Sequence, residues 1–179
     1  MLAHCLTGLR LLLVLPVAYC FARPQAVPAW LPLLVMAVAI TTDLLDGRVA
    51  RARGTASPAG QLFDHTTDCL FVSAALAGAA YAGFLTPLLP PLVVLAFAQY
   101  VLDSRFLHRQ KQLRMSSIGR YNGIFYFVPP LLLAFAMPAS AAVGDFLRVL
   151  VPWCAWALVL STLVSIIDRA LARTSRSTS

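Results

Sequence analysis

The chain contains no glutamate and few charges of either sign. Charged residues make up 12% of its 179 residues, while hydrophobic residues make up 60%. This composition excludes an ordinary soluble domain and predicts an all-α integral membrane protein. The net charge of +7 does not indicate a nucleic-acid partner, because the basic residues alternate with long apolar runs instead of forming one patch.

Cysteine is also scarce, and its placement excludes two kinds of site. The four cysteines lack the spacing of zinc ligands, so we expect buried free thiols and neither zinc sites nor disulfides. A cleavable signal peptide is not expected either, because Ala22-Arg23-Pro24 is a poor cleavage site. The first apolar run is therefore predicted to remain as a helix. The cysteines are Cys5, Cys20, Cys69 and Cys154.

Six apolar runs follow one another along the chain. With its flanks, each approaches the ~20 residues that cross ~30 Å of hydrocarbon. The six runs therefore predict six transmembrane helices. Basic residues are concentrated in alternate connections and in the tail, so the positive-inside rule predicts that both termini are cytoplasmic. We expect one domain, residues 1–173, followed by a disordered tail, 174–179. The runs are 6–21, 27–42, 70–89, 90–102, 121–139 and 149–167.

Four of the seven aspartates lie where the second run ends and the third begins. On a helix, Asp43 and Asp46 share one face with two very small residues. Asp64 and Asp68 form a second stripe with Gly60, at a spacing of four residues. The segment between the stripes, 52–59, is rich in turn residues and predicts a hairpin that brings the four carboxylates together.

Carboxylates gathered in a partly desolvated place repel one another, unless their pKa values rise or cations bind. Oxygen ligands suit Mg²⁺ or Mn²⁺, and four carboxylates could hold two ions. Arg48, Arg51 and Arg53 lie at the same rim and suit phosphate. The residues therefore indicate a metal-assisted site for a diphosphate-containing substrate at a membrane surface. The alternative is a buried ion-pair cluster of the aspartates with these three arginines.

The motif D-x2-D-G-x2-A-R-x8-G-x3-D-x3-D spans residues 43–68, and this sequence matches all eight of its fixed positions. In this it resembles the CDP-alcohol phosphatidyltransferase family. The resemblance implies transfer of a phosphatidyl group from CDP-diacylglycerol to an alcohol, with release of CMP. It also implies a homodimer in the bacterial cytoplasmic membrane. The positive-inside rule places the motif, and with it the expected active site, on the cytoplasmic side.

The same resemblance implies roles for individual residues. Two Mg²⁺ or Mn²⁺ ions would be held by Asp43, Asp46, Asp64 and Asp68. Asp68 would also act as the catalytic base on the acceptor hydroxyl. The residues implied to bind the CDP donor are Thr7, Gly47, Ala50, Arg51, Ser57 and Gly60.

A second, partial resemblance lies near the N-terminus. Leu6-Thr7-x-x-Arg10 is similar to the L-T-x-x-R element that lies near the nucleotide in bacterial phosphatidylglycerophosphate synthases of this family. An equal alternative is that Arg10 is an interfacial residue whose charge reaches the membrane surface.

The acceptor is indicated by the basic segment 105–120. By resemblance, Arg105, Arg109 and Arg120 would bind a phosphorylated acceptor, with glycerol 3-phosphate as the best candidate. The alternative is that they set topology and contact lipid headgroups. The run 57–65 looks more like choline and ethanolamine phosphotransferases, which use diacylglycerol as acceptor, and His65 within it is expected to point away from the ligands.

One alternative comes from another class of protein. Carboxylates within the membrane also mark ion pathways, so a divalent-cation channel or transporter is the rival interpretation. Such a pathway would not need Gly47, Ala50 and Arg51 at fixed offsets from the aspartates.

Overall fold

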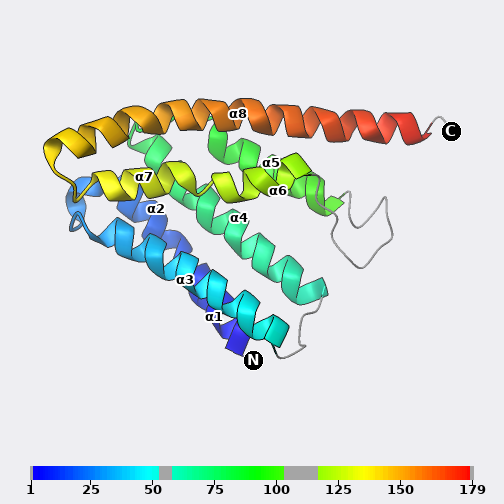
Figure 1. Ribbon diagram of the computed structural model, residues 1–179, viewed down its shortest axis with the longest axis horizontal. Helices are drawn as coiled ribbons and strands as arrows, with labels where there is room; N and C mark the ends of the chain where they lie inside the picture. Colours follow the sequence, from blue (N-terminus) through cyan, green and yellow to red (C-terminus); the bar gives the residue numbers. More distant parts are fainter. Residues whose placement is uncertain (1, 53–57, 103–116, 178–179) are drawn as a thin grey trace.

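The computed structural model describes residues 2–52, 58–102 and 117–177, which are almost entirely helical and contain no strand. The long helix α8 extends beside α6 and α7, while α4 crosses the molecule toward the ends of α1 and α3 (Figure 1). The elements are α1 Leu2–Leu12, α2 Val14–Ala22, the 3₁₀ turn η1 Pro24–Ala26, α3 Leu31–Ala52, α4 Pro58–Tyr81, α5 Leu89–Leu102, α6 Ser117–Phe125, α7 Val128–Ala136 and α8 Ala141–Ser177.

Prolines divide two of the apolar runs into pairs of helices. The first run breaks at Leu13 because Pro16 has no N–H to donate to the carbonyl of Leu12, four residues earlier. The fifth run breaks between α6 and α7 for the same reason, since Pro129 and Pro130 follow the break.

Each of the six predicted apolar runs is largely helical, but several boundaries differ from the prediction. The third run was expected to continue to residue 89, whereas α4 ends at Tyr81. A turn follows in which Gly83 has a φ of +82°, a conformation that glycine adopts without steric cost. The second run continues beyond its apolar part, so α3 extends through Asp43 to Ala52.

Among the described residues, one helical segment is both long and apolar enough to cross a membrane. It comprises residues 141–170 of α8, with a mean hydropathy of 2.1 over its most apolar window. Four shorter apolar helical segments accompany it. Six membrane spans and the cytoplasmic position of both termini remain predictions.

Helices α2 and α4 approach each other closely. Gly78 of α4 lies directly against the α2 backbone, and a Cβ atom built on it would collide with the carbonyl oxygen of Ala18. The same atom would lie 3.1 Å from the backbone nitrogen of Ala22. Ala75 and Ala79 on the same part of α4 are fully buried, so a stripe of small residues allows the two helices to pack at short range.

The C-terminal end of α8 also differs from the expectation. The helix continues through Ser177, whereas a disordered tail was expected from residue 174. Adding residues to an existing helix needs no new nucleation, which favours this extension of the backbone helix.

Candidate active site

Arg10 occupies the centre of the aspartate cluster. Helix α1 packs against both α3 and α4, and this places Arg10 between them with only 1% of its surface exposed. Its Nη1 donates to Oδ1 of Asp43 at 2.9 Å. The same guanidinium forms ion pairs with Asp64 through Nη2 and with Asp68 through Nη1. Carboxylates from two helices therefore converge on one buried cation.

The convergence follows from the helix lengths. Because α4 is unbroken from Pro58 to Tyr81, residues 60, 64 and 68 lie on one face of it, as their spacing predicts. Asp43 lies within α3, on the neighbouring helix. The side chains of Asp43, Asp64 and Asp68 retain 43%, 26% and 26% of their exposure, so a ligand can approach the carboxylates from solvent.

Two threonines show how the surrounding polar groups are satisfied. Thr42, beside Asp43, donates to the carbonyl of Val38 at 2.8 Å, and Thr67, beside Asp68, donates to the carbonyl of Phe63 at 2.9 Å. Both hydroxyls therefore bond within their own helices. The carboxylates next to them are directed to partners on other helices.

His65 lies closer to the cluster than the sequence suggests. One ring nitrogen of His65 and one carboxylate oxygen each of Asp64 and Asp68 lie within 4.8 Å of one another, so these three residues could hold a metal ion. The expectation that His65 points away from the ligands was therefore wrong. A neighbour of Asp64 is rotated by about 100° on the helix, but the length of the imidazole allows its nitrogen to reach back.

The donor set fits a hard divalent cation. Among the side chains that the structure describes, the carboxylates of Asp43, Asp64 and Asp68 outnumber the guanidinium of Arg10 with which they pair, so this group attracts further positive charge. Carboxylate oxygens are the ligands that Mg²⁺ and Mn²⁺ prefer. The alternative of a buried ion-pair cluster is realised in part, with Arg10 as the partner of the aspartates.

The structure describes the other predicted site residues to different extents. Thr7 is buried on α1, one turn before Arg10, and Gly60 lies in the first turn of α4. The structure describes the helical backbone at Asp46, Gly47, Ala50, Arg51 and Arg120 but not their side-chain environments. Ser57, Arg105 and Arg109 lie outside the described residues altogether.

Beyond His65, a group of residues that the sequence did not single out extends the site. The rings of His65 and Tyr100 lie 6.5 Å apart, and the guanidinium carbon of Arg169 lies 5.7 Å from the centre of the Tyr100 ring. Arg169 thus comes from α8 toward the aspartates of α4. No local signal distinguishes it from the other basic residues near the C-terminus, because its position depends on how α8 packs against α5.

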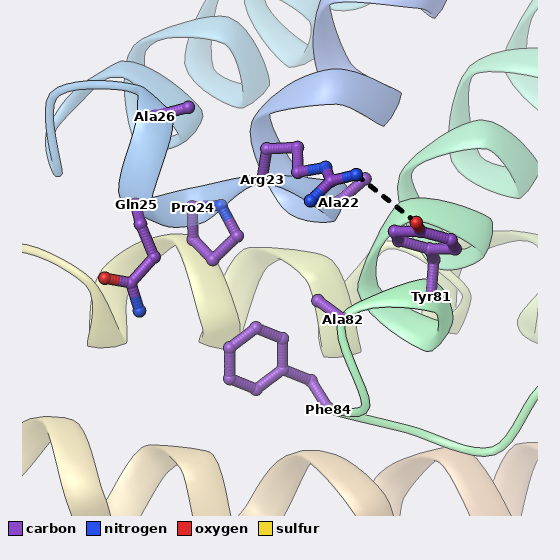
Figure 2. A pocket seen from close by; sticks show the side chains of 8 residues that line it. All are labelled: Ala22, Arg23, Pro24, Gln25, Ala26, Tyr81, Ala82 and Phe84. Carbon is purple, nitrogen blue, oxygen red and sulfur yellow. Dashed lines mark hydrogen bonds between the residues drawn. The ribbon is translucent and has the colours of Figure 1, made fainter.

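A cavity of about 540 Å³ lies far from this cluster, at the other end of α2 and α4. The 17 residues from Asp64 to Tyr81 separate the two places by about 25 Å along the helix. Figure 2 shows Arg23 directed toward Tyr81 beside this cavity, with a hydrogen bond of 3.4 Å to the phenol oxygen. The cavity is lined by Ala22, Arg23, Pro24, Gln25, Ala26, Tyr81, Ala82 and Phe84 and contains no carboxylate.

A family comparison agrees with the aspartate cluster. The family model described as CDP-alcohol phosphatidyltransferase matches residues 1–161, most of the chain. The chain belongs to this family. The CDP-alcohol phosphatidyltransferases are membrane enzymes of phospholipid synthesis that transfer substituted phosphate groups and use divalent metal ions. No curated protein and no solved structure matches the chain significantly.

Proposed function

We propose that this phosphatidyltransferase moves the phosphatidyl group of CDP-diacylglycerol to glycerol 3-phosphate and releases CMP. The observation that supports this most directly is the convergence of Asp43, Asp64 and Asp68 from two helices on one small volume around Arg10. A diphosphate donor needs concentrated positive charge, and carboxylates are the groups that recruit it as metal ions.

Asp43, Asp46, Asp64 and Asp68 would hold two Mg²⁺ or Mn²⁺ ions. When bound, these ions supply positive charge that neutralises the diphosphate and the departing CMP. Asp68 accepts the proton of the acceptor hydroxyl as its oxygen forms a bond to the phosphatidyl phosphorus. The bond from that phosphorus to the bridging oxygen breaks, and CMP departs with the bridging oxygen. The protein mainly positions the two substrates for this in-line displacement.

The donor would lie between α1 and α3. Gly47 and Ala50 would border the cytidine because their small side chains leave room against the helix backbone. Arg51 and Ser57 would contact donor phosphate, while Thr7 and Gly60 complete this side of the site. The burial of Thr7 beside Arg10, on the helix that packs against α3, supports this placement.

The acceptor would approach from the side of α5 and α8. Arg105, Arg109 and Arg120 would bind its phosphate by charge, as the basic segment 105–120 predicts. Arg169 adds a cation on this side, close to Tyr100 and His65. A phosphorylated acceptor suits such a surface better than a neutral alcohol does.

The membrane in which the enzyme lies, its orientation and its oligomeric state are proposals as well. We place the chain, as one domain over residues 1–173, in the bacterial cytoplasmic membrane, with the aspartates at the cytoplasmic face, because the positive-inside rule assigns the basic connections to that side. We also propose a homodimer, on the resemblance alone. Crosslinking in native membranes, read as a band at twice the monomer mass, tests that assembly.

The test is CMP release by the purified protein in detergent. We expect release with CDP-diacylglycerol and glycerol 3-phosphate, loss of release on chelation, and recovery with Mg²⁺ or Mn²⁺. Matched assays replace glycerol 3-phosphate with inositol phosphate, serine, inositol or phosphatidylglycerol. Release that depends on one of these alone would identify a different acceptor.

A second candidate function within the family is supported by His65, which follows the third aspartate as in choline and ethanolamine phosphotransferases. Activity with CDP-choline or CDP-ethanolamine and diacylglycerol, but none with CDP-diacylglycerol, would favour that branch. The rival channel or transporter is not favoured, since the family consists of enzymes. The size of the chain favours the compact type that uses CDP-diacylglycerol.

A further inference from the structure

We propose that Arg10 is an internal counter-cation that occupies the metal site of the unloaded enzyme and is displaced when divalent ions bind. This inference rests on the proposed metal-dependent function and adds a regulatory residue to it. Arg10 would thereby set the metal concentration at which the enzyme becomes competent.

Arg10 and a metal ion would need the same oxygen atoms. Oδ1 of Asp43 and Oδ1 of Asp68 both accept from Nη1, and Oδ1 of Asp64 accepts from Nη2. These three carboxylates come from two helices, yet all of them are directed to one guanidinium. A divalent ion, which requires ligands at about 2.1 Å, would therefore compete with the guanidinium for these oxygens.

The two cations would also repel each other. A divalent ion among these carboxylates would lie within about 4 Å of the guanidinium, and two like charges at that range repel strongly where water is partly excluded. The carboxylates attract either cation, but they cannot bring both into the same small volume at low cost. Metal binding and the three Arg10 ion pairs are therefore expected to exclude each other.

The burial of Arg10 points the same way. An interfacial arginine extends its charge to the membrane surface, but only 1% of Arg10 is exposed. Burying an arginine this completely is costly unless carboxylates pair with it. Its burial is thus explained by the aspartates, and the mutual repulsion of the aspartates is relieved by Arg10. Each partner stabilises the other while the metal is absent.

The structure of α1 fits such a displacement. At Leu13, α1, which carries Arg10, meets α2, which is held against α4 at Gly78. Leu13 still donates its N–H to the carbonyl of Leu9 at 3.1 Å and accepts from the N–H of Val17 at 2.9 Å, so Leu13 itself keeps its helical bonds at this junction. In the displacement that we propose, the guanidinium leaves the carboxylates by rotation of its own long side chain.

The test compares the affinity for Mn²⁺ in the full-length protein and in its Arg10→Gln variant, in detergent without nucleotide, by electron paramagnetic resonance of free Mn²⁺. We expect Arg10→Gln to bind Mn²⁺ about tenfold more tightly. In the wild type, only the fraction of molecules in which Arg10 has left the carboxylates can bind the ion, and this lowers the apparent affinity. The metal-free variant should unfold at a lower temperature than the wild type, and Mn²⁺ should raise its unfolding temperature by more.

Arg148→Gln is the matched control. Arg148 also pairs with an aspartate, Asp145, at 2.9 Å, but this pair is exposed and lies on α8. Its removal should leave Mn²⁺ affinity unchanged. If Arg10→Gln cannot be purified, Arg10→Lys provides the same comparison. The lysine ammonium replaces only some of the N–H donors of the arginine guanidinium, so it should compete less well for the carboxylates. Mn²⁺ binding should therefore tighten again, but by less than in Arg10→Gln.

Two results would overturn the inference in distinguishable ways. If the wild type binds Mn²⁺ and the Arg10 variants bind it equally or more weakly, Arg10 supports the metal site and does not compete with it, while the proposed function stands. If the wild type binds neither Mn²⁺ nor Mg²⁺, the proposed metal-dependent function fails, and the inference fails with it.

Discussion

The two ends of α4 each meet an arginine from another part of the chain, and the two arginines are used differently. Arg10 is buried and pairs with three carboxylates, whereas Arg23 is exposed and contacts the ring and hydroxyl of Tyr81. The Arg23 end has the cavity of about 540 Å³. The Arg10 end has the groups that can perform chemistry. In this molecule, converging charges locate the site, and open volume does not.

The largest effect is expected from removing one carboxylate at the Arg10 end. Asp68→Asn should lower CMP release by about 100-fold or more, because the variant loses the base that accepts the hydroxyl proton and one ligand oxygen loses its charge. The unfolding temperature should stay close to that of the wild type. Turnover is measured with CDP-diacylglycerol and glycerol 3-phosphate at saturating Mg²⁺.

Asp145→Asn is the control for that substitution. The side chain of Asp145 is 73% exposed and pairs with Arg148 on the same helix, so its loss should leave turnover unchanged. Turnover that survives Asp68→Asn would remove Asp68 as the base. The functional difference between the Arg10 end and the Arg23 end would then depend on the metal ligands alone.

An intermediate effect is expected between the two ends, where α2 meets α4. Gly78→Leu forces a side chain against the backbone at Ala18 and Ala22 and should destabilise the protein by about 1–3 kcal/mol, as overpacking commonly does. Thermal unfolding in detergent measures the loss. Turnover should also decrease, since α4 carries Asp64 and Asp68.

Gly123→Leu is the matched change, because a Cβ atom at Gly123 meets nothing within 4 Å. This substitution in α6 should be neutral or slightly stabilising, since leucine has the higher helix propensity. Equal losses at Gly78 and Gly123 would show that the close contact of α2 with α4 contributes nothing particular.

The smallest effect is expected at the cavity end. Arg23→Gln should keep kcat/KM for CMP release within about twofold of the wild type, because an exposed arginine with one long hydrogen bond contributes little. Steady-state kinetics of CMP release provide the measurement. A loss comparable to that of Asp68→Asn would break the comparison and assign the cavity a part in the reaction.

Local spacing predicted what lies within one helix. The stripe of Gly60, Asp64 and Asp68 follows from a period of four residues, and the break before Pro129 follows from a missing N–H. The family motif was recognisable for the same reason, because its eight positions lie within 26 consecutive residues. These features depend on chain geometry over short distances.

Contacts between distant segments were not predictable in this way. The resemblance of Leu6-Thr7-x-x-Arg10 places Arg10 near the nucleotide, but local spacing does not show that α1 packs against both α3 and α4. Spacing alone therefore pairs the aspartates with the nearby arginines 48, 51 and 53. The approach of Arg169 to Tyr100 likewise depends on how α8 packs. Spacing assigned His65 to another face of α4, but it did not account for the reach of the ring.

The contact at Gly78 makes α4 a lever with its pivot far from the chemistry. Asp68 lies 10 residues from Gly78, or about 15 Å along the helix, so a tilt of about 5° at the pivot moves its carboxylate by about 1 Å. Aspartate has a short side chain that cannot compensate for such a shift. The distance between α2 and α4 at a pair of small residues is therefore part of the dimensions of the active site, and a mutational screen would report Gly78 as a catalytic position although it touches no substrate.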